Sequence, residues 1–176
     1  MNDLDKIIVT DLEMSGLTPG THGILSIGAV PLYGEEEFYL ELHLDPMQTF
    51  DPKALQINGF SPQDCLDQSK PGQKEGVKSF YDWVEKRRSR WGGELAIIAG
   101  HNVHCDMSFL KSVKNSWPFK YRILDAHGLA LGKYGMSFSS EELCEFLGVE
   151  KENSVHNALE GAKMAKRLLR KMIDNK

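Results

Sequence analysis

A short apolar run that ends in two acids constrains the fold of this chain more than any other stretch. Residues 7–9 are β-branched and apolar, as in a buried strand, and Asp11 and Glu13 follow them. Because residues i and i+2 of a strand point to the same face, the two carboxylates are expected to converge. They either hold a hard cation such as Mg²⁺ or Mn²⁺, or form a polar strand end that faces solvent.

The composition is that of an ordinary globular protein. The chain has 176 residues, of which 41% are hydrophobic and 26% are charged, and we expect one domain over residues 1–176. No apolar run is long enough to cross a bilayer, no hydrophobic leader precedes the first strand, and the three cysteines are widely spaced. These features predict a cytoplasmic protein with reduced thiols and no membrane partner.

Two segments carry clustered basic residues although the formal net charge is −4. They are residues 86–90 and the tail from 163 to 176. Each is either a surface that follows phosphates or a solvated helix face.

The hydrophobic pattern predicts a mixed sheet. After the first strand, a second is expected over residues 24–32 and a third over 37–44, where apolar and polar residues alternate as in a half-exposed antiparallel strand. The apolar run 95–99 is typical of a central strand, and 121–125 predicts a further short one. We expect an α/β fold in which an antiparallel three-strand meander is extended by parallel strands and flanked by helices.

Capping residues mark several helices. Asp51 and Ser61 each precede a proline, a residue favoured in the first turn, and Ser139 with Glu142 forms a capping box. Residues 68–76 are expected to form a loop, and Asp125 is expected to cap a helix instead of binding metal. The other expected helices cover the apolar positions between 77 and 91, the segment 106–113, the segment 126–131, a segment ending at Gly148, and residues 156–173.

Asp11, Glu13, Asp106 and His156 occur in the order found in the DEDD superfamily of 3′–5′ exonucleases. The surrounding sequences resemble its histidine-containing branch, DEDDh. The similar segments are 11–17, 54–60, 101–106 and 155–162, and they resemble ribonuclease T, oligoribonuclease and proofreading exonuclease domains. This resemblance implies a ribonuclease H-like fold.

The resemblance also implies an activity and its residues. The chain would hydrolyse phosphodiester bonds at single-stranded RNA or DNA 3′ ends with two Mg²⁺ or Mn²⁺ ions and release nucleoside 5′-monophosphates. Asp11, Glu13 and Asp106 would bind the metals, and His156 would act as general base. The positions expected to contact the terminal nucleotides are Met14, Leu17, Asn58, Phe60 and Asn102. The resemblance also suggests a homodimer, and it does not separate RNA from DNA.

One functional position departs from the family pattern. The third motif of that family has an aspartate five residues after the histidine, and this chain has Gly161 there. Glu160 is adjacent, but successive helical residues are rotated by about 100°, so Glu160 replaces the missing acid only if the helix shifts. We expect one metal to be weakened and the activity attenuated. The alternative is a catalytically impaired exonuclease-fold protein that binds nucleic acid or a protein partner.

Overall fold

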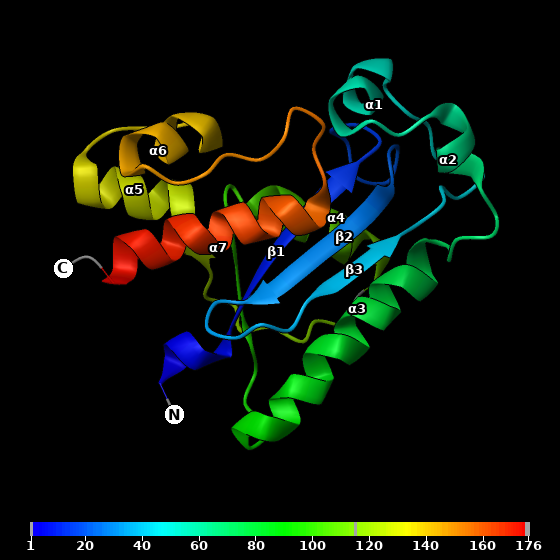
Figure 1. Ribbon diagram of the computed structural model, residues 1–176. Coiled ribbons are helices and arrows are strands. Elements are labelled where there is room, and N and C mark those ends of the chain that lie inside the picture. The colour runs from blue at the N-terminus through cyan, green and yellow to red at the C-terminus, as the bar shows by residue number, and fades with distance from the viewer. Residues whose placement is uncertain (1, 115, 175–176) are drawn as a thin grey trace.

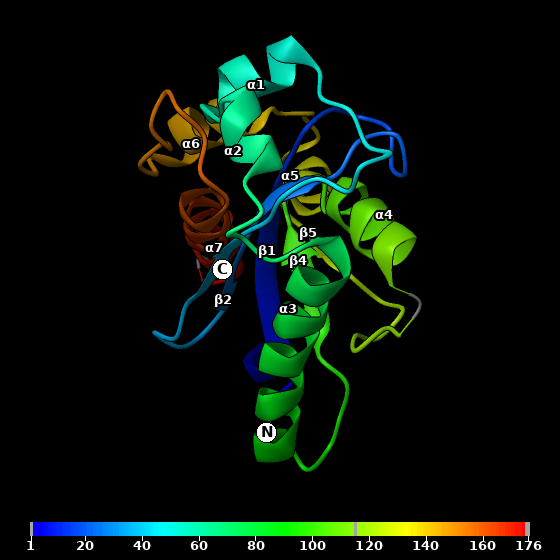
Figure 2. The same ribbon diagram turned by 90° about the vertical axis from the view of Figure 1, so that its right-hand side faces the viewer.

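A five-stranded sheet lies at the centre of the computed structural model, which describes residues 2–114 and 116–174. Its strands are β1 (Ile7–Met14), β2 (Ile24–Pro31), β3 (Phe38–Glu41), β4 (Ile97–Gly100) and β5 (Leu124–Asp125) (Figure 1 and Figure 2). Their order is β3-β2-β1-β4-β5, with antiparallel pairing among β1, β2 and β3 and parallel pairing of β1 with β4 and of β4 with β5. The predicted meander with added parallel strands is therefore confirmed.

Helices connect and flank these strands. They are α1 (Pro52–Asn58), α2 (Pro62–Leu66), α3 (Gln73–Arg88), α4 (His104–Val113), α5 (Ala126–Tyr134), α6 (Ser140–Leu147) and α7 (Ala158–Asp174), with short 3-10 turns at Asp3–Lys6 and Ser89–Trp91. The predicted caps are present: Asp51, Ser61 and Ser139 accept hydrogen bonds from the first turns of α1, α2 and α6. In the described part of the chain, no helix has the length and apolar character that a membrane span requires.

The alternation of side chains along β1 decides which helices each face of the sheet meets. Ile7 and Val9 pack in the apolar cluster that contains residues of α5, α6 and α7, whereas Ile8 packs with residues of α3 and α4. Figure 2 shows α7 on one side of the sheet and α3 and α4 on the other. Because Asp11 and Glu13 continue the series that starts with Ile7 and Val9, their side chains point to the α7 face.

Several strands and helices differ from their predicted bounds, and β3, β5 and α3 show the physical reasons. β3 ends at Glu41 because, after a last hydrogen bond from the Leu42 N–H to Leu25 of β2, the N–H groups of His43 and Leu44 donate to Pro71 and Cys65. β5 is limited to its last two residues. α3 begins at Gln73, inside the predicted loop, where the Gln73 side chain bonds both the N–H and the carbonyl of Ile24 at 2.8 Å. The side-chain amide thus ties the start of α3 to β2.

The last helix begins after His156, not at it. Asn157 Oδ1 accepts hydrogen bonds from the N–H groups of Leu159 at 3.0 Å and Glu160 at 3.3 Å, as an N-cap residue does. His156 therefore lies in the loop between α6 and α7, where helical geometry does not set the direction of its side chain.

The basic segment 86–90 has an internal partner. Arg87 Nη2 and Arg90 Nη1 lie 2.8 and 2.9 Å from the Glu36 carboxylate, and the Arg87 guanidinium stacks on the Trp83 ring at 3.3 Å. These contacts favour the interpretation of residues 86–90 as a structural helix end over a phosphate-binding surface.

Candidate metal and nucleic-acid site

β1 presents Asp11 and Glu13 where α7 begins, and a glycine on β2 allows the helix to lie this close. Gly28 pairs with Asp11 across the sheet, and a Cβ atom at Gly28 would lie 2.1 Å from the backbone of Ala158. Any side chain at Gly28 would therefore push α7 away. Glu13, two residues further along β1 on the same face, is 8% exposed and lies near Glu152 and His156 of the loop before α7.

α4 brings Asp106 to the same end of the sheet. Because β4 runs parallel to β1, the helix that follows β4 starts near the carboxyl end of β1. Asp106 Oδ1 accepts a hydrogen bond from the Leu12 N–H at 2.9 Å, and Asp106 is 4% exposed. Asp106 is thus held against the main chain of Leu12, which lies between Asp11 and Glu13.

His156 approaches from the loop that precedes α7. Its backbone N–H donates to the carbonyl of Ile57 in α1 at 3.1 Å, which anchors this loop. Its side chain is 42% exposed, and Nδ1 lies 4.0 Å from Oε2 of Glu152. The imidazole is therefore accessible while one of its nitrogens faces an acid.

Glu152 is a site residue that the motif comparison did not include. Its side chain is 8% exposed, and Oε1 accepts a hydrogen bond from the Asn157 N–H at 2.6 Å. One ligand atom each from Glu13, Glu152 and His156 lie within 4.8 Å of one another. Sequence offered one weak signal, an acid four residues before the histidine, but no periodicity in a loop tells which way such a side chain points.

Gly161 faces Asp11 directly. A Cβ atom at Gly161 would lie 2.3 Å from Oδ2 and 2.8 Å from Cγ of Asp11, so the Asp11 carboxylate already fills the space beside this helix position. Glu160 points elsewhere: its Oε1 lies 3.1 Å from Nζ of Lys163, which also pairs with Glu37 at 3.0 Å. In this arrangement of α7, Glu160 does not line the cavity that contains Asp11.

The clustered acids destabilise one another when they are charged. Burial raises the pKa of Glu13 to about 8, and repulsion from Glu152 and Asp106 adds to the shift. Burial, followed by repulsion from the same neighbours and Glu13, raises the pKa of Asp11 well above its usual range. Burial also raises the pKa of Asp106 and of Glu152. A bound cation would relieve this repulsion.

The donor set fits a hard divalent cation. A cavity of about 140 Å³ is lined by Asp11, Glu13, Glu152 and His156, and carboxylate oxygens are the ligands that Mg²⁺ and Mn²⁺ prefer. His101 lines the same cavity, and its Nε2 is buried without a hydrogen-bond partner. Such a buried nitrogen is expected to meet water or a ligand. Asp106 is not among the residues that line this cavity.

A second cavity, of about 240 Å³, adjoins the first at His156. Its wall includes Tyr39, Asn58, Phe60 and His156. The side chain of Asn58 joins two predicted nucleotide contacts, because Nδ2 donates to the Met14 carbonyl at 3.1 Å and Oδ1 accepts from the Phe60 N–H at 3.3 Å. This arrangement brings Met14, Asn58 and Phe60 together beside the histidine.

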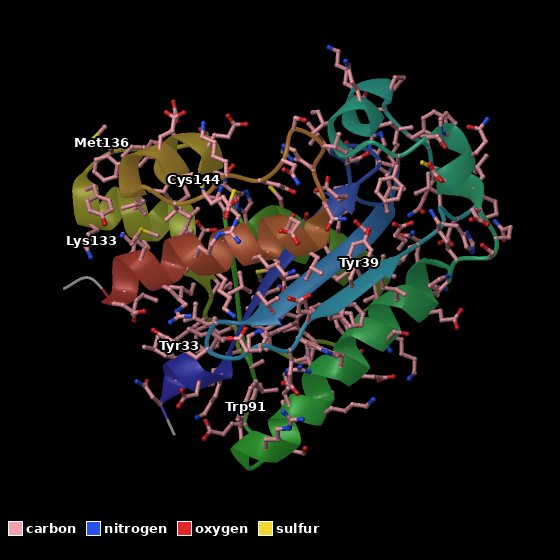
Figure 3. The ribbon with its side chains drawn as sticks, in the orientation of Figure 1. Tyr33, Tyr39, Trp91, Lys133, Met136 and Cys144 are labelled. Atoms are coloured by element: carbon pink, nitrogen blue, oxygen red, sulfur yellow. The ribbon has the colours of Figure 1, made fainter. Side chains whose placement is uncertain are left out.

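Tyr39 was not predicted as part of the site, whereas the predicted nucleotide contacts Met14, Leu17 and Asn102 line neither cavity. Figure 3 shows Tyr39 in front of the sheet near the start of α7, and its hydroxyl accepts a hydrogen bond from Asn157 Nδ2 at 3.3 Å. Leu17 is 89% exposed in the loop after β1, and Asn102 has a φ of 56° in the turn after β4. Asp125 caps α5 through the Gly128 N–H at 3.0 Å, as predicted.

The site and the fold lie within one stretch of family similarity. Residues 8–169 match the exonuclease family RNase_T. The chain belongs to this exonuclease family. It is similar to ribonuclease T of Escherichia coli K12, with 27% identity over 170 residues that cover 86% of this chain and 77% of that protein. It is also similar to ribonuclease T of Yersinia enterocolitica, with 30% identity over 111 residues that cover 58% of this chain and about half, 51%, of that protein.

Solved exonuclease structures share the fold. The nuclease domain of 3′hExo, a DEDDh family member bound to rAMP, has a TM-score of 0.77 over 97% of this chain and 92% of that chain, at 16% identity. S. pombe Pop2p in its Mg²⁺- and Mn²⁺-bound form has a TM-score of 0.68 over 93% of this chain and 81% of that chain, at 10% identity. The family match and the relatives therefore confirm the predicted resemblance to ribonuclease T, and the solved structures confirm the ribonuclease H-like fold.

Proposed function

We propose that this chain, as one domain over residues 1–176, is a divalent-metal-dependent 3′–5′ exonuclease. It would hydrolyse the terminal phosphodiester bond of single-stranded RNA or DNA and release nucleoside 5′-monophosphates. The observation that carries the proposal is the grouping of Asp11, Glu13 and His156 around one cavity, with Asp106 bonded to β1 beside them. Membership of the exonuclease family supports the reaction class.

Each residue has a distinct task in this proposal. Mg²⁺ or Mn²⁺, when bound, would neutralise phosphate charge and lower the pKa of the attacking water. Asp11 and Glu13 would hold the cation from β1, and Asp106 would support it from α4. His156 would accept the proton of the attacking water, since its Nδ1 faces Glu152 at 4.0 Å and its Nε2 is left for that proton.

The second cavity suits the end of a single strand. Phe60 and Tyr39 offer aromatic faces next to His156, and stacking of one base on such a face is worth about 1–3 kcal/mol. Lys70 Nζ lies 5.2 Å from the centre of the Phe60 ring but is paired with Glu41 at 2.9 Å, so the aromatic faces and not a free positive charge would hold the terminal base. Stacking acts on every base, so this surface would bind ends with little dependence on sequence.

The test is cleavage of end-labelled single-stranded RNA and DNA oligonucleotides with Mg²⁺, Mn²⁺ or EDTA. The wild type is expected to shorten them from the 3′ end only with a cation, and the same gel reports the preferred sugar. Asp11→Asn is expected to lower the rate by at least about 100-fold, because a ligand of the catalytic cation is worth several kcal/mol. Asp82→Asn is the matched control, since Asp82 is an exposed residue of α3 that pairs with Lys78.

Three outcomes would count against the proposal: no shortening of either substrate with either cation, shortening without a cation, or full activity in Asp11→Asn. Gly161 favours a second candidate function, namely binding without cleavage. An oligonucleotide that binds the wild type with a cation and stays intact would support that alternative.

A further inference from the structure

The family position for the fourth acid is occupied by Gly161, yet a further carboxylate is present in the cavity. We propose that Glu152, from the loop between α6 and α7, replaces the missing helical aspartate as a ligand of the divalent cation. This inference rests on the proposed function, because it concerns the same metal site.

The first argument is the direction of the Glu152 side chain. Its neighbours Lys151 and Asn153 are exposed, but the Glu152 side chain is 8% exposed and lines the cavity that also holds Asp11 and Glu13. A charged loop residue normally remains in water, since burial of an unpaired carboxylate costs several kcal/mol. The hydrogen bond from the Asn157 N–H to Oε1 holds the side chain inward and leaves Oε2 directed at the site.

The second argument is the spacing of the donor atoms. Ligand atoms of Glu13, Glu152 and His156 lie within 4.8 Å of one another. Two oxygens bound to one Mg²⁺ are about 3–4 Å apart, because each metal–oxygen bond is about 2.1 Å long. Small side-chain rotations would therefore let Glu13 and Glu152 hold the same ion.

The third argument is that position 161 has no room for a carboxylate while the Asp11 side chain lies as it does. The 2.3 Å approach of a Gly161 Cβ to Asp11 Oδ2 excludes any side chain without a rearrangement. Glu160 is paired with Lys163 and does not line the cavity. Of the acids near the start of α7, Glu152 is the one whose side chain faces the metal-site carboxylates.

The experiment measures Mn²⁺ binding without nucleic acid or turnover. Metal-free wild type and variants are titrated with Mn²⁺ by calorimetry and by electron paramagnetic resonance of free Mn²⁺. Glu152→Gln keeps the size of the side chain and an oxygen for the Asn157 N–H, and it is expected to weaken Mn²⁺ binding by about tenfold or more.

Two matched variants control for the loss of one negative charge. Glu150→Gln changes an exposed acid two positions away in the same loop, and Glu160→Gln changes the acid adjacent to Gly161. Both are expected to stay within about twofold of the wild type, because solvent screens charges that do not touch the ion. Thermal melts of all variants establish that each protein is folded.

The outcomes separate this inference from the proposed function. If Asp11→Asn loses Mn²⁺ binding and Glu152→Gln keeps it, the metal site stands and the role of Glu152 is refuted. If Glu152→Gln keeps its Mn²⁺ affinity but changes the pH profile of cleavage, Glu152 only positions His156, which also refutes the inference. If Glu160→Gln, and not Glu152→Gln, weakens binding, the wrong acid has been assigned. A wild type that binds no Mn²⁺ at millimolar concentration overturns both proposals.

Discussion

Replacement of Gly161 by alanine tests whether the contact between α7 and Asp11 shapes the metal site. Alanine is about 1 kcal/mol better than glycine inside a helix, so the change alone should stabilise the protein. At Gly161, however, the new methyl group would lie 2.3 Å from Oδ2 and 2.8 Å from Cγ of Asp11. Gly132 in α5 is the matched control, because it is an exposed helical glycine whose Cβ position has no neighbour within 4 Å.

The magnitude follows from these distances. Relief of the contact at Gly161 requires the Asp11 carboxylate to move by roughly 1 Å, and such overpacking costs about 1–3 kcal/mol. The free energy of unfolding of Gly161→Ala is therefore expected to lie between that of the wild type and a value about 2 kcal/mol lower, whereas that of Gly132→Ala should rise by about 1 kcal/mol. For a domain of this size, each kcal/mol corresponds to about 2–4 °C in Tm. A displacement of about 1 Å at a metal ligand should also lower the cleavage rate by about 100-fold.

The assay compares thermal melts and Mn²⁺ titrations of the two alanine variants. The reasoning is refuted if Gly161→Ala is as stable as Gly132→Ala and binds Mn²⁺ as tightly as the wild type. Gly161→Asp extends the comparison, because it adds the family's aspartate where Asp11 already lies. We expect Gly161→Asp alone to leave Mn²⁺ affinity unchanged or lower, and combination with Glu152→Gln to relieve part of the repulsion among the carboxylates.

Two further predictions concern pH and the second cavity. Burial raises the pKa of Glu13 from its usual 4.5 to about 8, so the free energy of unfolding of the metal-free protein should fall by roughly 1–3 kcal/mol as pH rises through that window. Mg²⁺ should suppress the fall. Urea unfolding at pH 6 and pH 8 with EDTA or Mg²⁺ measures this, and a free energy of unfolding that rises over the same range contradicts it. Phe60→Ala should weaken oligonucleotide binding by roughly 5-fold to 100-fold through the loss of stacking. Phe146→Ala, which changes a 50% exposed aromatic residue on α6, should leave binding unchanged. Fluorescence anisotropy measures both affinities, and equal effects of the two changes would exclude stacking at Phe60.

The sheet was predictable because its information is local. The apolar runs in β1, β2 and β4 indicate buried strands from neighbouring residues alone, and caps such as Asp51 and Ser139 lie next to the helices they start. The ends of β3 and the start of α3 were not predictable, because they depend on distant partners. His43 finds the carbonyl of Pro71, and Gln73 finds the main chain of Ile24.

In the site, too, features with a local sequence signal were predictable and features that depend on distant partners were not. The motifs place Asp11, Glu13, Asp106 and His156 in one chain order, and the parallel pairing of β1 with β4 brings α4 to the end of β1. The direction of Glu152 follows from a bond that no sequence pattern encodes, the one from the Asn157 N–H. A glycine within a strand signals close approach by another element, but not which element. At Gly28 that element is the first turn of α7.

The geometry suggests why a glycine on α7 and an acid in the preceding loop occur together. A hard cation requires a number of carboxylate oxygens around it and does not require that they come from one element. A helical position cannot move without its helix, and α7 is held against β2 at Gly28. The loop before α7 does not follow the helical path: it is held at Glu150, whose carbonyl accepts a hydrogen bond from Arg167 Nη2 at 3.2 Å, and at its end by the His156 N–H to Ile57 and the cap at Asn157. A longer glutamate side chain from that loop can therefore reach the cavity while Gly161 leaves the Asp11 carboxylate its place.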